Sequence, residues 1–227
     1  MRVLVIGKGG REHTIIWKLK QSKLVKDIFI ATGNGGMCQM GHCLPIDPLD
    51  IDGLVKFALE NQIDLTIVGP EDPLAAGIID EFEKWGLDAF GPTKKAAQLE
   101  ADKSFAKDFM RKYGIPTAEY EIFESPKSAL AYIRKKGLPV VLKATGLAAG
   151  KGAFVLTKKK DVARVVNEVM VERCLGKAGE RVVIEEYLSG YEVSIFALVD
   201  GQTIMYLPSA QDHKRLLDRD RGPNTGG

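Results

Sequence analysis

The sequence predicts an α/β fold in two parts: an open parallel sheet with helices on both faces, followed by a smaller α+β unit. Over residues 1–100, short apolar runs alternate with helical segments, a pattern typical of parallel sheets. The glycine and proline at 91–92 end that alternation. From residue 122 the order becomes helix, strand, glycine-rich loop, strand, helix, strand, which favours an α+β unit.

Apolar runs and helical periodicity place the elements of the first part. We expect strands at 3–6, 28–31 and 65–68, and helices at 12–20, 54–60 and 74–85. Ligands of open α/β sheets bind beyond the carboxyl ends of the strands. We therefore look for ligand-binding residues in the turns that follow these strands, at 7–10, 33–36 and 69–73.

The first turn matches a dinucleotide-binding fingerprint only in part. Glu12 stands at its third glycine position, and no acid follows the second strand, which disfavours a nicotinamide cofactor. Gly9, Gly10 and Arg11 precede a helix, where backbone N–H groups bind anions. The turn therefore predicts a site for a phosphorylated sugar, although a tight turn without a ligand stays open.

Glu71 follows the strand at 65–68, in Gly-Pro-Glu-Asp-Pro. Its carboxylate suits an amine or a sugar hydroxyl. It equally suits the cap of a helix beginning at Leu74, because acids stabilise helix N-termini. Both interpretations stay open.

Helices are expected at 96–100, 103–113, 128–136 and 161–172, and strands at 140–143, 153–156 and 181–185. Residues 192–199 and 203–207 read as a hairpin that turns at Asp200-Gly201. Helical spacing in the first two helices predicts a core face made of Ala97, Leu99, Phe105, Phe109 and Met110.

A glycine-rich segment follows the strand at 140–143. Lys143 ends this strand, and residues 145–152, the glycine loop, contain Gly146, Gly150, Lys151 and Gly152. Such a loop can close its N–H groups over an anion, while the lysine adds positive charge. The pattern is not a P-loop. It favours the phosphates of a nucleoside triphosphate, against the alternative of a mobile loop beside a structural lysine.

The strand at 182–184 ends in two acids. Glu185 and Glu186 are followed by Tyr187 and Leu188, a segment whose backbone could face an adenine edge. Glu192 could accept hydrogen bonds from ribose hydroxyls. We therefore expect these residues to frame a nucleoside.

Composition narrows the class of protein. The net charge is +2, and 27% of the 227 residues are charged, so neither nucleic acid nor a membrane surface is expected as a partner. No apolar run has membrane-spanning length. The chain begins with a strand rather than a signal peptide, and its three cysteines lack framework spacing. We expect a cytoplasmic protein, without a metal at Cys38, His42 and Cys43.

Five motifs resemble the phosphoribosylamine–glycine ligases, an ATP-grasp family. They are Gly-Lys-Gly-Gly-Arg-Glu-His at 7–13, Gly-Pro-Glu-Asp-Pro-Leu at 69–74, Lys-Ala-Thr-Gly-Leu-Ala-Ala-Gly-Lys-Gly at 143–152, Gln-Asp-His-Lys-Arg at 211–215 and Gly-Pro-Asn-Thr-Gly-Gly at 222–227. Lys8, Thr145 and Leu175 depart from the family pattern. The resemblance covers residues 1–227.

The resemblance implies a division of the chain. Residues 1–100 would form a Rossmann-like, pre-ATP-grasp domain that binds substrate, and 101–121 a linker helix of the ATP-grasp core. Residues 122–188 would form the α+β lid subdomain, and 189–227 the start of an incomplete core. It further implies that the chain is an N-terminal piece, inactive by itself, with an open sheet edge that lowers solubility.

The activity implied is the joining of glycine to 5-phosphoribosylamine with ATP, through a glycyl phosphate. Lys103 would reach the nucleotide phosphates, and Asp212 the glycine ammonium. Lys214 and Arg215 would bind phosphate or carboxylate, and Asn224, Thr225 and Gly226 the substrates. Ligands for Mg²⁺ or Mn²⁺ would lie beyond Gly227, and the intact enzyme would be a monomer. Two alternatives stay open: another ATP-grasp carboxylate–amine ligase, and a nucleotide-binding fragment without turnover.

Overall fold

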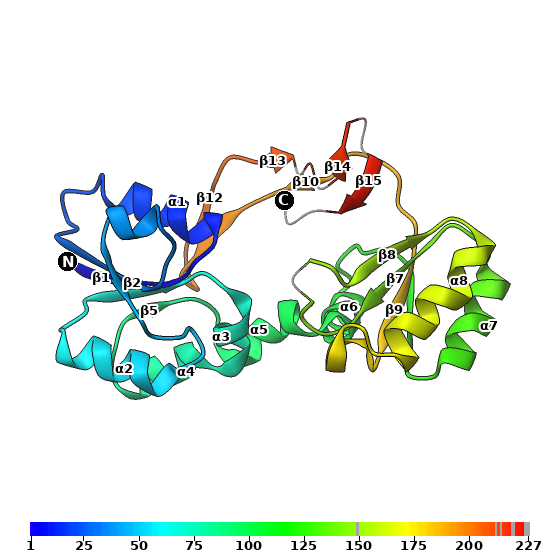
Figure 1. Cartoon of the computed structure of the whole chain (residues 1–227), viewed down its shortest axis with the longest axis horizontal. Coiled ribbons are helices and arrows are strands. Elements are labelled where there is room, and N and C mark those ends of the chain that lie inside the picture. The colour runs from blue at the N-terminus through cyan, green and yellow to red at the C-terminus, as the bar shows by residue number, and fades with distance from the viewer. Residues whose placement is uncertain (149, 212, 214, 219–220, 225–227) are drawn as a thin grey trace. The chain divides into compact units, whose positions relative to one another are not determined.

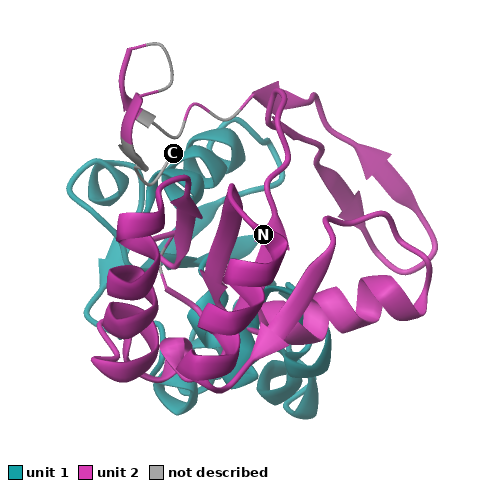
Figure 2. Ribbon diagram, turned by 90° about the vertical axis from the view of Figure 1, so that its right-hand side faces the viewer, with its two compact units in different colours: residues 1–101 teal, residues 102–227 magenta. Residues whose placement is uncertain are grey.

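Residues 1–148, 150–211, 213, 215–218 and 221–224 are described by the structure, a computed structural model of the chain (Figure 1). They divide into two units, residues 1–101 and 102–227 (Figure 2). Each unit has its own sheet and its own apolar core.

Unit 1 contains a five-stranded parallel sheet, which confirms the predicted fold class. The strand order is β3-β2-β1-β4-β5, so β1 lies at the centre and pairs with β2 and β4. The strand order reverses its direction at β1, because β2 and β3 lie on one side of it and β4 and β5 on the other. Sheets of this kind bind ligands at this topological switch point, between β1 and β4. The strands are β1 (Arg2–Gly7), β2 (Asp27–Thr32), β3 (His42–Leu44), β4 (Leu65–Val68) and β5 (Ala89–Phe90).

Side chains of β1 alternate between two apolar clusters. Leu4 and Ile6 join the cluster of α2 (Ile51–Glu60) and α4 (Ile78–Lys84). Val3 and Val5 pack on the other face, with α1 (Gly10–Leu19) and the 3₁₀ helix η1 (Met37–Gln39). Figure 1 shows α1 on one side of the sheet and α2 with α4 on the other. Both faces are thus buried, as expected for a parallel sheet.

Both tryptophans of the chain lie in unit 1, on its surface. Trp17 is 56% exposed and Trp85 58% exposed. The last helix of this unit is α5 (Lys94–Ala101). Its Ala97 is buried, but its Leu99 is 46% exposed, so the predicted core role of Leu99 is wrong.

The helix predicted at 74–85 is two helices. Gly77 has φ = 101°, a left-handed conformation that ends α3 (Glu71–Ala76) before α4 begins. Glu71 is the first residue of α3, and the N-cap is Pro70, without a side-chain bond. The interpretation of Glu71 as a capping residue is therefore wrong.

Unit 2 contains a four-stranded antiparallel sheet in the order β6-β9-β7-β8. One face is covered by α7 (Pro126–Lys136), α8 (Lys159–Val166) and the π-helical turn η2 (Asn167–Val171). The helix predicted at 161–172 is thus α8 followed by η2. The acidic stretch at 119–124 is strand β6, which sequence reasoning missed. The strands are β6 (Tyr120–Phe123), β7 (Val140–Ala144), β8 (Ala153–Leu156) and β9 (Val182–Glu186).

Helix α6 (Lys103–Lys112) packs against β9 through polar residues. Asp102 caps it by accepting from the backbone N–H groups of Ser104 and Phe105. The buried side chains of α6 are Ser104 and Lys107, whereas Phe105 is 41% exposed. The predicted core role of Phe105 is therefore wrong, whereas Phe109 and Met110 are half-buried. The inward side of the helix carries Lys107, which faces a buried carboxylate on β9.

The end of the described chain consists of three short antiparallel pairs. β10 (Val193–Ser194) pairs with β13 (Ala210–Gln211), β11 (Ala197–Val199) with β12 (Ile204–Tyr206), and β14 (Arg215–Leu217) with β15 (Arg221–Asn224). The predicted hairpin is confirmed for β11 and β12, whose turn is held by the Asp200 carboxylate. Most large apolar side chains of these pairs are exposed, and Tyr206 is 73% exposed.

Cys38 and Cys43 form a disulfide, with 5.3 Å between their Cα atoms, although the spacing of the three cysteines indicated no disulfide framework. The described residues contain no group of three or more His, Cys, Asp and Glu arranged for a metal. No helix in the described ranges has the length and apolar character to cross a membrane.

Candidate functional site

Lys143 and Glu185, proposed separately from the sequence, meet on the sheet of unit 2. Lys143 on β7 pairs in register with Val183 on β9, and Val141 pairs with Glu185. Lys143 and Glu185 therefore project from the same face, diagonally opposite each other. Lys143 Nζ donates to Glu185 Oε2 at 2.8 Å. The Glu185 side chain is 6% exposed and that of Lys143 32% exposed.

The second oxygen of Glu185 faces another lysine. Glu185 Oε1 lies 3.2 Å from Lys107 Nζ, while Lys107 donates to Thr117 Oγ1 at 2.7 Å and to the Ala118 carbonyl at 3.4 Å. No described group makes a hydrogen bond to Oε1, which is buried. Sequence reasoning missed Lys107. The available signal was its spacing of four residues from Lys103, which places both lysines on one side of α6.

Lys103 contacts the start of the glycine loop. Its Nζ donates to the Gly146 carbonyl at 3.2 Å, and its backbone N–H donates to the Thr145 carbonyl at 2.8 Å. The loop closes where the Ala144 N–H donates to the Gly152 carbonyl at 2.8 Å. The structure thus brings Lys103, Lys143 and the two ends of the loop together.

Gly150 occupies the exposed middle of the loop. It has φ = 75°, and a Cβ there would meet nothing within 4 Å. Only the backbone conformation therefore calls for glycine. Lys151 next to it is exposed. Ala149 lies outside the described residues.

Asp102 connects α6 to the strand that carries Glu185. Its Oδ2 accepts from Arg181 Nη2 at 2.8 Å, just before β9. Burial raises the pKa of Asp102, but hydrogen bonds from Ser104 and the Phe105 N–H outweigh that effect. With the added charge of Arg181, the pKa of Asp102 lies below its ordinary value.

The residues after β9 that were predicted to frame a nucleoside differ in their contacts and in their exposure. Glu186 accepts from the Glu119 N–H at 2.9 Å, so its carboxylate holds the end of edge strand β6. Tyr187 and Leu188 are 45% and 65% exposed. Glu192 lies on the exposed segment just before β10.

In unit 1, the first turn meets the turn after β4. Arg11 Nη1 donates to the Gly69 carbonyl at 2.6 Å, and Arg11 Nη2 lies 3.7 Å from Glu71 Oε2. Both side chains border a cavity of about 290 Å³. It lies at the switch point of the sheet, where the sequence predicted the sugar site. Its lining residues are Arg11, Gly69, Glu71, Leu74, Pro92, Ala97 and Glu100.

Glu12 shapes this turn, a role that sequence reasoning missed. It is 4% exposed, and its Oε2 accepts from the Gly9 N–H at 2.7 Å. A Cβ at Gly7 would lie 2.7 Å from Glu12 Cγ. The carboxylate therefore occupies the inside of the turn and uses one of its N–H groups. Gly10 begins α1, and a Cβ there would meet nothing within 4 Å.

The predicted catalytic and substrate residues near the end of the chain are mostly undescribed. Asp212, Lys214, Thr225 and Gly226 lie outside the described residues. The backbones of Arg215 and Asn224 pair in register between β14 and β15.

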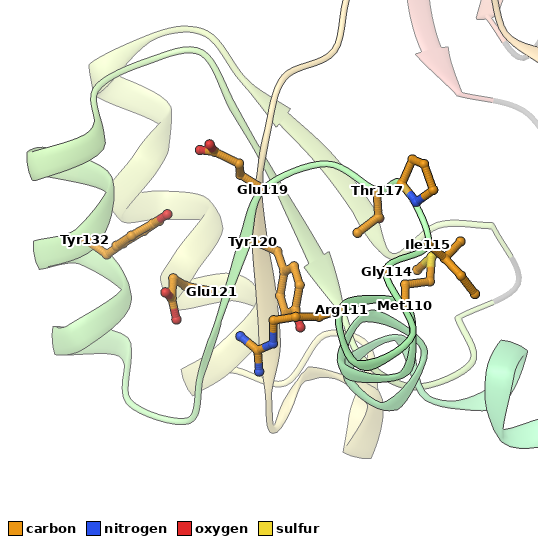
Figure 3. A pocket seen from close by; sticks show the side chains of 10 residues that line it. Met110, Arg111, Gly114, Ile115, Thr117, Glu119, Tyr120, Glu121 and Tyr132 are labelled. Atoms are coloured by element: carbon orange, nitrogen blue, oxygen red, sulfur yellow. The ribbon is translucent and has the colours of Figure 1, made fainter.

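A separate hollow of about 550 Å³ lies where α6 ends beside β6 (Figure 3). The Arg111 guanidinium lies 5.1 Å from the centre of the Tyr120 ring. Burial and a 2.8 Å hydrogen bond from the Tyr120 hydroxyl to Asp108 raise the pKa of Tyr120 to about 12. None of the predicted site residues lines this hollow. The lining residues are Met110, Arg111, Gly114, Ile115, Pro116, Thr117, Glu119, Tyr120, Glu121 and Tyr132.

Comparison with known proteins assigns both parts of the chain. Residues 1–100 match the phosphoribosylglycinamide synthetase N domain, and 101–227 its ATP-grasp (A) domain. The chain is 52% identical over 227 residues to phosphoribosylamine–glycine ligase of Halalkalibacterium halodurans, and 49% identical over 229 residues to that of Escherichia coli K12. It covers 53% of each, so it spans about half the length of these curated relatives.

Solved structures agree on the fold. A phosphoribosylamine–glycine ligase from Thermotoga maritima matches all of this chain and 54% of its own, with a TM-score of 0.79 and 34% identity. The biotin carboxylase domain of Hydrogenobacter thermophilus 2-oxoglutarate carboxylase matches 94% of this chain and 50% of its own, with a TM-score of 0.74 and 20% identity. The second likeness concerns the fold alone.

Proposed function

Because the chain belongs to the phosphoribosylglycinamide synthetase family, we propose that it forms part of a ligase that joins glycine to 5-phosphoribosylamine with ATP. The observation that carries this proposal is the meeting of Lys103, Lys143 and Glu185 around the glycine loop of unit 2. Family membership supports the reaction, and the arrangement of these residues in unit 2 supports the binding of ATP.

The reaction has two steps. A carboxylate oxygen of glycine attacks the γ-phosphorus of ATP, the bond to the bridging oxygen breaks, and ADP leaves. The amine of phosphoribosylamine then attacks the acyl carbon of the glycyl phosphate and loses a proton, and inorganic phosphate leaves. Neither step needs a side-chain nucleophile. Positioning and charge neutralisation therefore account for catalysis.

Unit 2 offers donors and an acceptor for the nucleotide. Lys103 and Lys143 would hold phosphate oxygens, and the N–H groups of the glycine loop would close over them. The backbone of Glu185 and Glu186, at the end of β9, would face the adenine edge. Tyr187, Leu188 and Glu192 would border the nucleoside.

The remaining site residues are assigned by the family motifs. In unit 1, Gly9, Gly10, Arg11 and Glu71 would bind the sugar phosphate and its amine. Arg11 supplies positive charge to the cavity at the switch point. Asp212, Lys214, Arg215, Asn224, Thr225 and Gly226 would bind glycine and phosphate.

Phosphoryl transfer from ATP ordinarily uses Mg²⁺ or Mn²⁺, which neutralises charge between the β- and γ-phosphates. Such ions prefer carboxylate oxygens. The described residues offer no cluster of three acids or histidines, so we assign no residue of this chain to the metal. We propose a monomer that acts on small molecules in the cytoplasm, where ATP is abundant, although the Cys38–Cys43 disulfide is untypical of a reducing compartment.

Calorimetric titration of the chain with ATP and Mg²⁺ tests the nucleotide site. We expect saturable binding that GTP does not reproduce, because the backbone groups that would face the exocyclic amine of adenine would meet a carbonyl of guanine instead. Absence of any saturable heat at millimolar ATP would overturn the proposal. Release of ADP is then measured with glycine and phosphoribosylamine, and with alanine in place of glycine. Binding of ATP without ADP release would identify a nucleotide-binding fragment, and equal turnover of alanine a different ligase.

A further inference from the structure

We propose that Lys107 is a positioning residue of the nucleotide site: it pairs with Glu185 so that the charge of Lys143 stays available to the triphosphate. This inference rests on the proposed function, because it assumes that Lys143 meets phosphate. Lys107 itself would touch neither substrate nor reacting atoms. It would act through Glu185.

The contacts of Glu185 carry the argument. Its carboxylate lies between two ammonium groups, with Lys143 2.8 Å from Oε2 and Lys107 3.2 Å from Oε1. The side chains of Lys107 and Glu185 are 9% and 6% exposed, whereas that of Lys143 is 32% exposed. Lys107 is therefore the enclosed partner, and Lys143 is the one that a ligand can reach.

The charges of the three groups explain why two lysines are present. Lys143 and Glu185 alone would form a neutral pair, which gives a polyanion little electrostatic reason to approach. Lys107 raises the sum of the three charges to +1. Because interactions between charges are stronger where water is excluded, a single added charge at this depth matters more than one on the surface.

The orientation of α6 places a lysine at the buried carboxylate of β9. Placing a lysine inside a protein is costly unless it is paired and hydrogen-bonded. The helix nevertheless turns Lys107 inward and leaves Phe105 41% exposed.

A purely structural role is the alternative that the test must separate. Lys107 also donates to Thr117 and the Ala118 carbonyl, so it ties the segment before β6 to α6. Its removal could loosen unit 2 without any effect specific to phosphate. The comparison of ATP with adenosine distinguishes the two roles, because adenosine has the same base and ribose but no phosphate.

The experiment measures Kd for ATP and for adenosine in the unaltered chain and in three variants. Lys107→Met removes the charge and keeps the length of the side chain, and Lys107→Arg keeps the charge. Lys112→Met is the matched control, since Lys112 is an exposed lysine on the same helix. We expect Lys107→Met to raise Kd for ATP about tenfold, equivalent to about 1.4 kcal/mol, and Kd for adenosine less than twofold. Lys107→Arg should recover most of the loss, and Lys112→Met should match the unaltered chain.

A double variant adds a second readout. If Lys107 acts by offsetting Glu185, then Glu185→Gln on the Lys107→Met background should restore the ratio of the two Kd values, because the charge sum returns to +1. If Lys107→Met loses as much affinity for adenosine as for ATP, or if Lys112→Met loses as much affinity for ATP as Lys107→Met, the role of Lys107 is overturned. The proposed function would still stand. Failure of the unaltered chain to bind ATP would instead overturn the proposed function, and this inference with it.

Discussion

Lys143 and Glu185, 42 residues apart in sequence, are joined by a 2.8 Å hydrogen bond across two neighbouring antiparallel strands. One group was expected to bind phosphate and the other to face a nucleoside. Their contact places the ammonium group of Lys143 beside a buried carboxylate, so a substitution at either residue should change the surroundings of the other.

Lys143→Ala should weaken ATP binding by more than about 1.5 kcal/mol, the scale of a hydrogen bond to a charged group. Calorimetry with ATP checks this. Lys158→Ala, which removes a lysine outside the site in the same unit, serves as control. Unchanged affinity in Lys143→Ala would remove this lysine from the nucleotide site.

Gly150→Ala should slow or weaken closure of the glycine loop. The positive φ of Gly150 disfavours a residue with a Cβ by about 1 kcal/mol. Gly114→Ala imposes similar backbone strain, since Gly114 has φ = 64°, but outside the loop. Stopped-flow measurements of ATP binding should show a change for Gly150→Ala only. A similar change in both variants would indicate general destabilisation.

Asp102→Asn should reduce stability in a pH-dependent way. The pKa of Asp102 is lowered in the folded chain, so its charge stabilises the fold above its unfolded pKa of about 3.9. This contribution is lost as the pH falls through the lower, folded value. Asn keeps a capping oxygen but loses the charge that faces Arg181. The variant should therefore be less stable at pH 7 by up to about 1 kcal/mol, and the difference should shrink in acid.

Urea unfolding at neutral pH and near pH 3, followed by circular dichroism, measures that difference. Asp108→Asn, which removes a carboxylate from an exposed pair with Arg111, is the comparison. If the unaltered chain and Asp102→Asn differ by the same free energy of unfolding at both pH values, the lowered pKa of Asp102 is contradicted.

Arg11→Met should weaken binding of a sugar phosphate at the cavity of unit 1. Arg11 is the basic residue among those that line this cavity, and an exposed site of this kind should lose about tenfold in affinity, or about 1.4 kcal/mol. Ribose 5-phosphate is a stable probe. Lys18→Met, at the other end of α1, should bind it normally. Equal affinity in Arg11→Met would place the phosphate elsewhere.

Reduction of the Cys38–Cys43 disulfide should destabilise unit 1. The bond closes a loop across five positions, and the chain-entropy estimate for so short a loop is about 2 kcal/mol. Unfolding with and without dithiothreitol measures the effect. Cys174→Ser, at an exposed free cysteine, should change nothing. Equal stability in both conditions would show that the bridge does not contribute.

Local patterns were enough to predict the parallel sheet and the glycine-rich segment after β7, but not the contact between Lys143 and Glu185. Strand alternation and glycine spacing are encoded within a few residues. The two halves of the helix expected at 74–85 were not separated, because a glycine inside a helical pattern does not reveal its φ angle. Strand β6 was missed because its polar residues reflect an edge position rather than a loop.

The interior roles of Glu12 and Lys107 could not be read from local patterns. A charged residue is usually exposed, and only its distant partner explains its burial. For Lys107 that partner is Glu185, 78 positions along the chain. The exposure of Phe105 on α6 has the same cause, since the side of the helix that carries Lys107 faces β9.

The location of Trp17 and Trp85 has a practical consequence for each of these experiments. Every indole of the chain belongs to unit 1, so emission excited where only indole absorbs reports on that unit alone. The signal of unit 2 must come from its tyrosines. One sample can therefore be observed through two intrinsic optical channels, one for unit 1 and one for unit 2, without attaching any dye.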